Sequence, residues 1–318
     1  MKKNSIVVIA GPTASGKTRL GIALAASFGG EIVSADSMQI YRGMDIGTAK
    51  ADAAERAAVP HHMLDVADPG ENYSVARYVQ EAGEICDRLL REGKLPVVVG
   101  GTGLYIDSLI AGRDFAGHEE DRTLRRELER QYDELGGEEM LRRLADFDPE
   151  RARRLHPGDK RRIVRAVEIF RLTGVTATAH DEETRQRPSR YAAARIVLGY
   201  EVRRDLYRKI DARVTQMVKN GLFEEVAGLL ASGISPACTA MQAIGYKEAA
   251  LALRGEMTRE QAADLIRQGS RRYAKRQLTW FGRWEDCLRI LWKEEPDFDV
   301  ALRISSAFLA EHGYIVRA

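Results

Sequence analysis

The sequence contains little cysteine and no long apolar segment, and each shortage excludes a class of protein. Its three cysteines, Cys86, Cys238 and Cys287, are single residues without paired spacing, so neither a disulfide framework nor a zinc site is predicted. No apolar run approaches the roughly 20 residues that a membrane-spanning helix needs. Residues 1–5 lead directly into a short apolar strand and do not resemble a signal peptide. We therefore expect a cytoplasmic protein without a structural metal.

The 318 residues have an ordinary folded composition but an uneven charge. With 44% apolar and 30% charged residues, the chain is suited to one large α/β core and a smaller unit. The net charge of +2 conceals two basic stretches. Residues 151–165 contain seven basic residues and one acid, and residues 265–284 contain six basic residues and no acid. Such stretches attract polyanions such as nucleic acid, although a solvated helix face has the same pattern.

The apolar pattern predicts alternating strands and helices near the N-terminus. Short apolar runs indicate strands at 5–10, 31–35 and 95–99, and helical periodicity follows the first run and fills 75–91. A new helix is expected after Gly103. Alternation of this kind predicts an α/β fold in which a parallel sheet has helices on both faces.

The pattern changes after residue 110, which predicts a second unit. Residues 112–190 lack strand signals and show charged helical periodicity, and a strand-like run returns at 196–200. We therefore expect an all-helical insertion at 112–190 within a core made of 1–111 and 191–318. The C-terminal region is predicted to be rich in helices, which dominate 204–276, with a last strand at 287–292. No internal repeat or coiled-coil heptad is evident, and we expect a monomer.

Residues 11–18 carry the strongest chemical signal, because they match the motif G-x-x-x-x-G-K-[ST] between a strand and a helix. In this P-loop, backbone N–H groups and the helix N-terminus surround phosphate oxygens. Lys17 would neutralise a diphosphate, and Thr18 would offer its hydroxyl to Mg²⁺. The predicted phosphate-binding residues are Gly11, Pro12, Thr13, Ala14, Ser15, Gly16, Lys17 and Thr18.

The predicted strand at 95–99 is not followed by a carboxylate of the kind that an ATPase uses to hold Mg²⁺. The run 95–99 ends in Gly100, Gly101 and Thr102, whereas the strand at 31–35 ends in Asp36. We expect Asp36 to lie at the tip of a strand neighbouring the P-loop and to act as a general base on an acceptor beside the phosphate. A helix N-cap or an indirect Mg²⁺ partner remains an alternative for this residue. The placement favours group transfer over hydrolysis.

Eight ordered blocks over nearly the whole chain are similar to those of the tRNA dimethylallyltransferases. They begin with the P-loop and Asp-Ser-Met-Gln-Ile-Tyr at 36–41 and end with Arg-Gln-Leu-Thr-Trp-Phe at 276–281. Between these lie the blocks 45–50, 61–65, 100–105, 159–163 and 242–248. One departure is Gly282, which separates this last block from Arg283 and leaves the local role of Arg283 open.

The resemblance implies transfer of a dimethylallyl group from its diphosphate to N6 of adenine 37, next to the tRNA anticodon. It implies that Asp36 is the base, and that Thr13 and Arg213 reach the diphosphate or the reacting centre. Without the resemblance, Arg213 reads equally well as a surface arginine on a helix. Gln39 is expected to recognise the adenine. The expected tRNA contacts are Asp36, Ser37, Met38, Gln39 and Thr102, with Arg125, Lys160, Arg161 and Arg162 in the insertion.

Several aromatic residues are candidates for stacking on RNA, with packing in the core as the alternative. They are Tyr41, Tyr246, Tyr273, Trp280 and Phe281.

Three other functions stay open on sequence grounds. A small-molecule kinase would bind ATP at the P-loop and use Asp36 to activate a hydroxyl. An RNA-binding module would use a nucleotide only as a structural or switching ligand, and would lose little when Asp36 is replaced. A third protein type would prenylate free adenine nucleotides, although the extensive basic surface argues against it.

Overall fold

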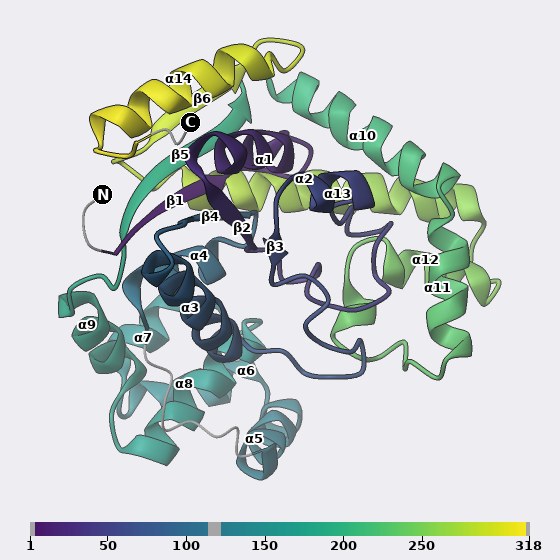
Figure 1. Cartoon of the computed structure of the whole chain (residues 1–318). Coiled ribbons are helices and arrows are strands. Elements are labelled where there is room, and N and C mark those ends of the chain that lie inside the picture. Colours follow the sequence, from purple (N-terminus) through teal and green to yellow (C-terminus); the bar gives the residue numbers. More distant parts are fainter. Residues whose placement is uncertain (1–3, 114–121, 316–318) are drawn as a thin grey trace. The chain divides into compact units, whose positions relative to one another are not determined.

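The computed structural model describes residues 4–113 and 122–315, and the chain divides into two compact units. Unit 1 consists of residues 1–112 and 190–318, and unit 2 of residues 113–189. Figure 1 shows the elements of both. Within the described residues, no helix is long and apolar enough to cross a membrane.

Unit 1 contains one sheet of six parallel strands, which confirms the predicted α/β fold. The strand order is β3-β2-β4-β1-β5-β6. The strands are β1 Ser5–Ala10, β2 Gly30–Ser34, β3 His61–His62, β4 Leu95–Gly100, β5 Ala192–Tyr200 and β6 Leu288–Trp292. β2, the strand before Asp36, is separated from β1 by one strand, because β4 pairs with β1 on one side and with β2 on the other.

Helices cover both faces of this sheet. The helices of unit 1 are α1 Lys17–Phe28, α2 Ala53–Ala58, α3 Val75–Arg91, α4 Gly103–Ala111, α10 Arg203–Lys219, α11 Leu222–Ala231, α12 Tyr246–Leu253, α13 Arg259–Phe281 and α14 Phe298–Glu311, with a short 3₁₀ turn at Ala240–Gln242. Figure 1 shows α1 and α14 on one side of the sheet and α3 and α4 on the other. Because side chains alternate between the faces of a strand, all six residues of β1 are buried.

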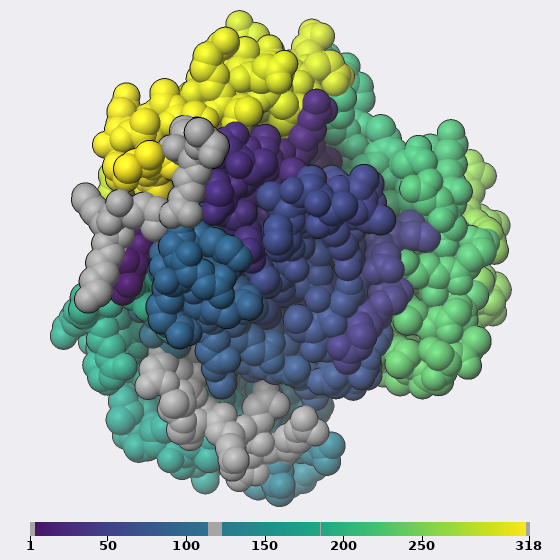
Figure 2. Space-filling view, viewed as in Figure 1, coloured from purple at the N-terminus to yellow at the C-terminus, as the bar shows by residue number. Residues whose placement is uncertain are grey.

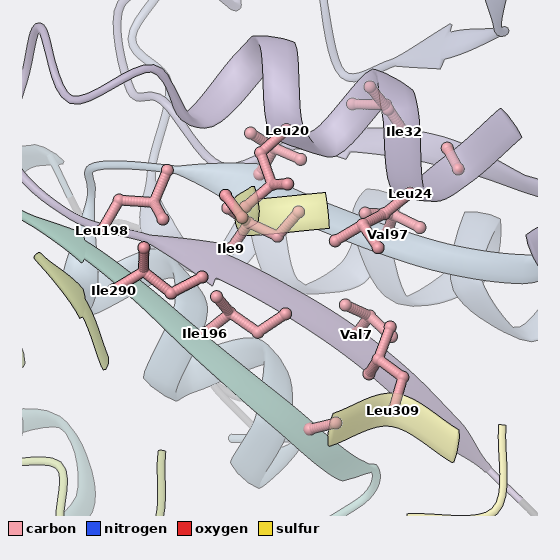
Figure 3. Packing of buried hydrophobic residues seen from close by; sticks show 14 of the residues in the cluster. Val7, Ile9, Leu20, Leu24, Ile32, Val97, Ile196, Leu198, Ile290 and Leu309 are labelled. Atoms are coloured by element: carbon pink, nitrogen blue, oxygen red, sulfur yellow. The ribbon is translucent and has the colours of Figure 1, made fainter. Parts of the chain in front are cut away.

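The face covered by α1 and α14 holds a large apolar cluster. Val7 and Ile9 of β1 pack in one cluster with Leu20 and Leu24 of α1, and Leu309 of α14 belongs to the same cluster (Figure 3). Helix α14, which the sequence pattern did not reveal, also supports the P-loop. A Cβ atom on Gly16 would lie 2.6 Å from the Phe298 ring, so the loop and α14 are in close contact.

A second cluster joins α10–α13 to the chain segment that follows β2. Tyr41 and Tyr246 are buried in it, and Phe281 is buried at the end of α13. Core packing, the alternative to RNA stacking, is therefore confirmed for these three rings. Trp280 donates its indole N–H to Asp107 at 2.8 Å and so ties α13 to α4.

Unit 2 is helical throughout its described residues, as predicted. Its helices are α5 Arg122–Leu135, α6 Gly137–Ala145, α7 Pro149–Arg154, α8 Lys160–Thr173 and α9 Ala177–Gln186. Leu128, Leu144 and Ile163 form its own apolar core with neighbouring residues. Asp148, only 2% exposed, caps α7 through the Arg151 N–H and accepts from the Thr178 N–H and hydroxyl, which joins α7 to α9. The predicted insertion includes residues 114–121, which lie outside the described residues.

Gly100, at the carboxyl end of β4, provides a test of how tightly the backbone is packed there. A Cβ atom on Gly100 would lie 2.1 Å from the Ala35 carbonyl oxygen, a backbone atom that side-chain motion cannot move away. Gly100→Ala is therefore expected to lower the free energy of unfolding by about 1–3 kcal/mol in urea denaturation. Gly70→Ala is the matched control, because a Cβ there meets nothing within 4 Å. Equal stabilities of the two variants would contradict the packing described.

Candidate active site

The P-loop closes on itself where β1 passes into α1. Gly11 and Gly16 have φ angles of 146° and 84°, in the region that favours glycine, and Ala14 also has a positive φ of 62°. The Ser15 hydroxyl donates to the Pro12 carbonyl at 2.8 Å, and Lys17 Nζ donates to the same oxygen at 2.7 Å. Trp292 of β6 donates its indole N–H to the Ser15 carbonyl at 3.0 Å. These bonds and glycine conformations hold the loop in its curled shape.

A cavity of about 80 Å³ lies beside this loop, and all three predicted catalytic residues line it. It is lined by Thr13, Lys17, Thr18, Asp36, Gln39 and Arg213, and also by Tyr273 and Gln277. Apolar side chains, among them Ile32, Leu64 and Val99, line the same space. A wider cavity of about 870 Å³ shares Lys17, Thr18 and Arg213 with it. Groups from α1, α10, α13 and the end of β2 therefore converge on one space.

Asp36 lies in the turn that follows β2. One carboxylate oxygen accepts the Met38 N–H at 2.9 Å, which fixes the side chain by the kind of local bond that the N-cap alternative anticipated. The same residue also lines the small cavity with Lys17 and Arg213. It therefore combines a backbone anchor with a place in the cavity.

The charged forms of Lys17 and Arg213 are disfavoured in the cavity, and a bound anion would favour them. Burial, followed by repulsion from Arg213, lowers the pKa of Lys17 to about 7, while Asp36 acts in the opposite direction. Burial also lowers the pKa of Arg213, whose guanidinium donates to the Thr48 carbonyl at 3.3 Å. A diphosphate placed between these groups would favour their charged forms.

The residues expected to contact the adenine are already bonded to the protein. The Gln39 amide donates to the carbonyls of Thr48 and Ala49, each at 3.2 Å, and its oxygen accepts from the Ser34 hydroxyl at 3.0 Å. An adenine contact by this amide requires that one of these bonds be exchanged. The Ser37 N–H donates to Thr102 Oγ1 at 3.0 Å, and Met38 packs against the second cluster.

Sequence reasoning missed Gln277 as a member of the site. Its side chain is only 4% exposed, and it accepts the Thr13 N–H at 2.8 Å and donates to the Gly101 carbonyl at 3.0 Å. It thereby ties the P-loop to the loop after β4. Its place in the block 276–281 was the only signal in the sequence. Tyr273, one turn earlier, lines the cavity, and burial together with Asp36 raises its pKa to about 12.

The four predicted tRNA contacts of the insertion belong to unit 2. Arg161 and Arg162 are exposed at the start of α8. Lys160 pairs with Asp133 at 2.6 Å, and Arg125 lies 3.8 Å from the buried Glu168 carboxylate. Two of the four cations therefore have acidic neighbours, and their contacts with RNA stay a prediction.

A magnesium ion at this site would depend on the ligand. Among residues 4–113 and 122–315 there is no group of three or more His, Cys, Asp or Glu side chains placed to hold a metal. The Thr18 hydroxyl and the Asp36 carboxylate nevertheless line the same cavity. Mg²⁺ commonly keeps waters and binds through one or two protein oxygens and substrate phosphates, so the residues present fit such an ion.

Comparison with known proteins identifies the family. A family model described as IPP transferase matches residues 39–284, and a model described as isopentenyl transferase matches residues 4–65. The chain belongs to the IPP transferase family. It is therefore a prenyltransferase, and the resemblance to tRNA dimethylallyltransferases is confirmed.

Relatives and solved structures match this chain over almost its full length. The tRNA dimethylallyltransferase 1 of Citrifermentans bemidjiense is 46% identical over 93% of this chain and 94% of its own. The solved tRNA isopentenylpyrophosphate transferase of Bacillus halodurans is 40% identical with a TM-score of 0.72, covering 97% of this chain and 96% of that one. A eukaryotic dimethylallyltransferase, solved in snapshots of it acting on tRNA, is 28% identical with a TM-score of 0.83 over 99% of this chain and 81% of its own.

The lowered pKa of Lys17 predicts proton uptake on diphosphate binding. With a pKa of about 7, Lys17 loses its proton as pH rises above 7, and a bound anion would raise that pKa, so the affinity for inorganic diphosphate should fall as pH rises through 7. The fall attributable to this proton should be at most about tenfold per pH unit. Titration calorimetry at pH 8 in two buffers of different ionisation enthalpy measures the uptake. Lys17→Arg, which stays charged, corrects for titration of the diphosphate itself, and equal uptake by both proteins would refute the assignment.

Proposed function

We propose that this protein transfers the dimethylallyl group from dimethylallyl diphosphate to N6 of adenine 37, beside the tRNA anticodon, and releases diphosphate. The observation that supports this most directly is that Asp36 lines the same cavity as Lys17, Thr18 and Arg213. The cavity therefore combines a carboxylate for a proton with cations for a departing anion. We expect a monomer that acts in the cytoplasm.

The P-loop would stabilise the negative charge of the leaving diphosphate. As the bond between C1 of the dimethylallyl group and the diphosphate oxygen breaks, the diphosphate keeps the electron pair and gains negative charge. Lys17, Arg213 and the amides of the loop are held in place to stabilise that charge where it develops. Mg²⁺ held by the Thr18 hydroxyl and phosphate oxygens would supply further charge neutralisation.

The acceptor is served by Asp36. The N6 nitrogen of adenine forms the new bond to C1, and its surplus proton passes to the Asp36 carboxylate. An adenine amine is a weak nucleophile, so removing its proton as the bond forms is a substantial part of the catalysis. The bond from Asp36 to the Met38 N–H keeps the carboxylate oriented during this step.

The apolar part of the cavity favours prenyl transfer over phosphoryl transfer. Ile32, Leu64 and Val99 line it together with the polar groups. Such a lining accommodates a five-carbon chain and keeps water from the reacting carbon. A kinase acceptor, which carries hydroxyl groups, would gain nothing from these side chains.

The RNA must present an unstacked base to this site. Flipping adenine 37 out of the anticodon loop costs a few kcal/mol, an order-of-magnitude figure for base extrusion. Phosphate contacts by basic residues, among them Arg125, Lys160, Arg161 and Arg162 of unit 2, would offset part of this cost. Gln39 lines the cavity together with Asp36, and Thr102 accepts the N–H of Ser37, the residue after Asp36, which supports contacts of both with the base.

A mass-spectrometric assay tests the proposed reaction. The protein is incubated with Mg²⁺, dimethylallyl diphosphate and an anticodon stem-loop, and we expect the RNA to gain one prenyl group on adenine 37. A stem-loop with guanine at that position is the matched control and should gain none. Parallel reactions contain ATP with a small-metabolite mixture, or free AMP in place of RNA.

The other outcomes identify the alternatives. Phosphate transfer from ATP without RNA prenylation would make the protein a kinase. Faster prenylation of AMP than of the stem-loop would make the acceptor a free nucleotide. Tight RNA binding without a product would leave a binding module.

A further inference from the structure

The loop of residues 45–50, one of the sequence blocks without an assigned role, supports two groups of the active site. The Thr48 carbonyl accepts from both Gln39 and Arg213, and the Ala49 carbonyl accepts from Gln39. Ala49 adopts a positive φ of 45°, which a residue with a side chain rarely takes unless its surroundings impose it. The positions of the Gln39 amide and the Arg213 guanidinium therefore depend on how this loop is held.

The Glu225 side chain, in the first turn of α11, holds the start of the loop. One carboxylate oxygen accepts the N–H groups of Asp45 and Ile46, each at 2.8 Å, and the other accepts the N–H of Gly47 at 3.2 Å. Charged acceptors make stronger hydrogen bonds than neutral ones, and successive N–H groups form a concave site for an anion. On the face drawn in Figure 2, the blue segment after β2 lies against the green helices of this region.

Tyr246, at the start of α12, secures the same carboxylate from the other side. Its buried hydroxyl donates to Glu225 at 2.5 Å. The ring also passes so near the loop that a Cβ atom on Gly47 would lie 2.4 Å from it. The blocks 45–50 and 242–248 are thus parts of one assembly around Glu225.

The end of the loop is fixed by Lys50. Its side chain is only 1% exposed and donates to the Tyr41 carbonyl at 2.8 Å and to the carboxylates of Asp45 and Asp65 at 2.5 and 2.6 Å. The strained backbone at Ala49 lies between this anchor and the one at Glu225.

We infer that Glu225 is a positioning residue for prenyl transfer, which acts by holding the 45–49 backbone so that its carbonyls orient Gln39 and Arg213. Glu225 itself does not line the cavity, so its effect passes through the loop. This role rests on the proposed function.

Glu225→Gln is the decisive variant. One carboxylate oxygen accepts two backbone N–H groups and the other accepts one backbone N–H and the Tyr246 hydroxyl, so an NH₂ group in either place sets a donor against at least one backbone N–H. We expect kcat/KM for the stem-loop and dimethylallyl diphosphate to fall about 10- to 100-fold, the range for a small misplacement of reacting groups. Glu224→Gln is the matched control, since Glu224 is exposed in the same turn and pairs only with Arg259 among the bonds described for its side chain. It should keep wild-type activity.

A double-mutant cycle separates positioning from general destabilisation. If Glu225 acts through Gln39, the loss caused by Glu225→Gln should shrink to a few-fold in a Gln39→Ala background, because coupled residues are not additive. An equal loss in both backgrounds would overturn the inference, as would wild-type activity of Glu225→Gln. If this variant does not fold, Tyr246→Phe removes one bond to the carboxylate and should show the same coupling at smaller amplitude. A wild-type protein that does not prenylate the stem-loop would instead refute the proposed function.

Discussion

The site depends on the absence of side chains where β4 ends. β4 separates the P-loop strand from β2, the strand that precedes Asp36, so a side chain at the end of β4 would hold the two apart. Gly100 lets the Ala35 carbonyl approach to where a Cβ would be 2.1 Å away, and Gly101 leaves the same narrow space for the Gln277 amide. This close packing of backbone brings the carboxyl ends of β1, β4 and β2 to one cavity. Side-chain contacts then hold the individual groups in place around it.

Electrostatics then gives the cavity its preference for an anion. Lys17 and Arg213 line this space together with the Asp36 carboxylate, and burial, followed by repulsion from Arg213, lowers the pKa of Lys17. A diphosphate bound between these groups would favour their charged forms. The P-loop is held in shape by its own bonds and by Trp292. We therefore expect its backbone N–H groups to need little rearrangement when a diphosphate binds.

Local features of the chain were predictable from sequence, whereas pairings between distant segments were not. The P-loop and the strand at 5–10 are encoded in consecutive residues, and the structure has both where the pattern put them. Strand order is a tertiary property, so the sequence did not reveal that β4 lies between β1 and β2. Gln277 and Glu225 contact loops more than 170 residues away, and no periodicity or motif reports such contacts. Arg213 was predicted only through the family resemblance, because the sequence of a helix does not distinguish a half-buried arginine from a surface arginine.

We propose that one cavity contains separate groups for stabilising the leaving group and for deprotonating the acceptor. Rapid-quench single turnovers with labelled dimethylallyl diphosphate and saturating stem-loop test it, comparing Asp36→Asn with Lys17→Met. The account predicts that Asp36→Asn binds the diphosphate within about threefold of wild type but transfers the prenyl group about 100-fold or more slowly, whereas Lys17→Met loses diphosphate affinity. Transfer by Asp36→Asn at the wild-type rate would contradict it.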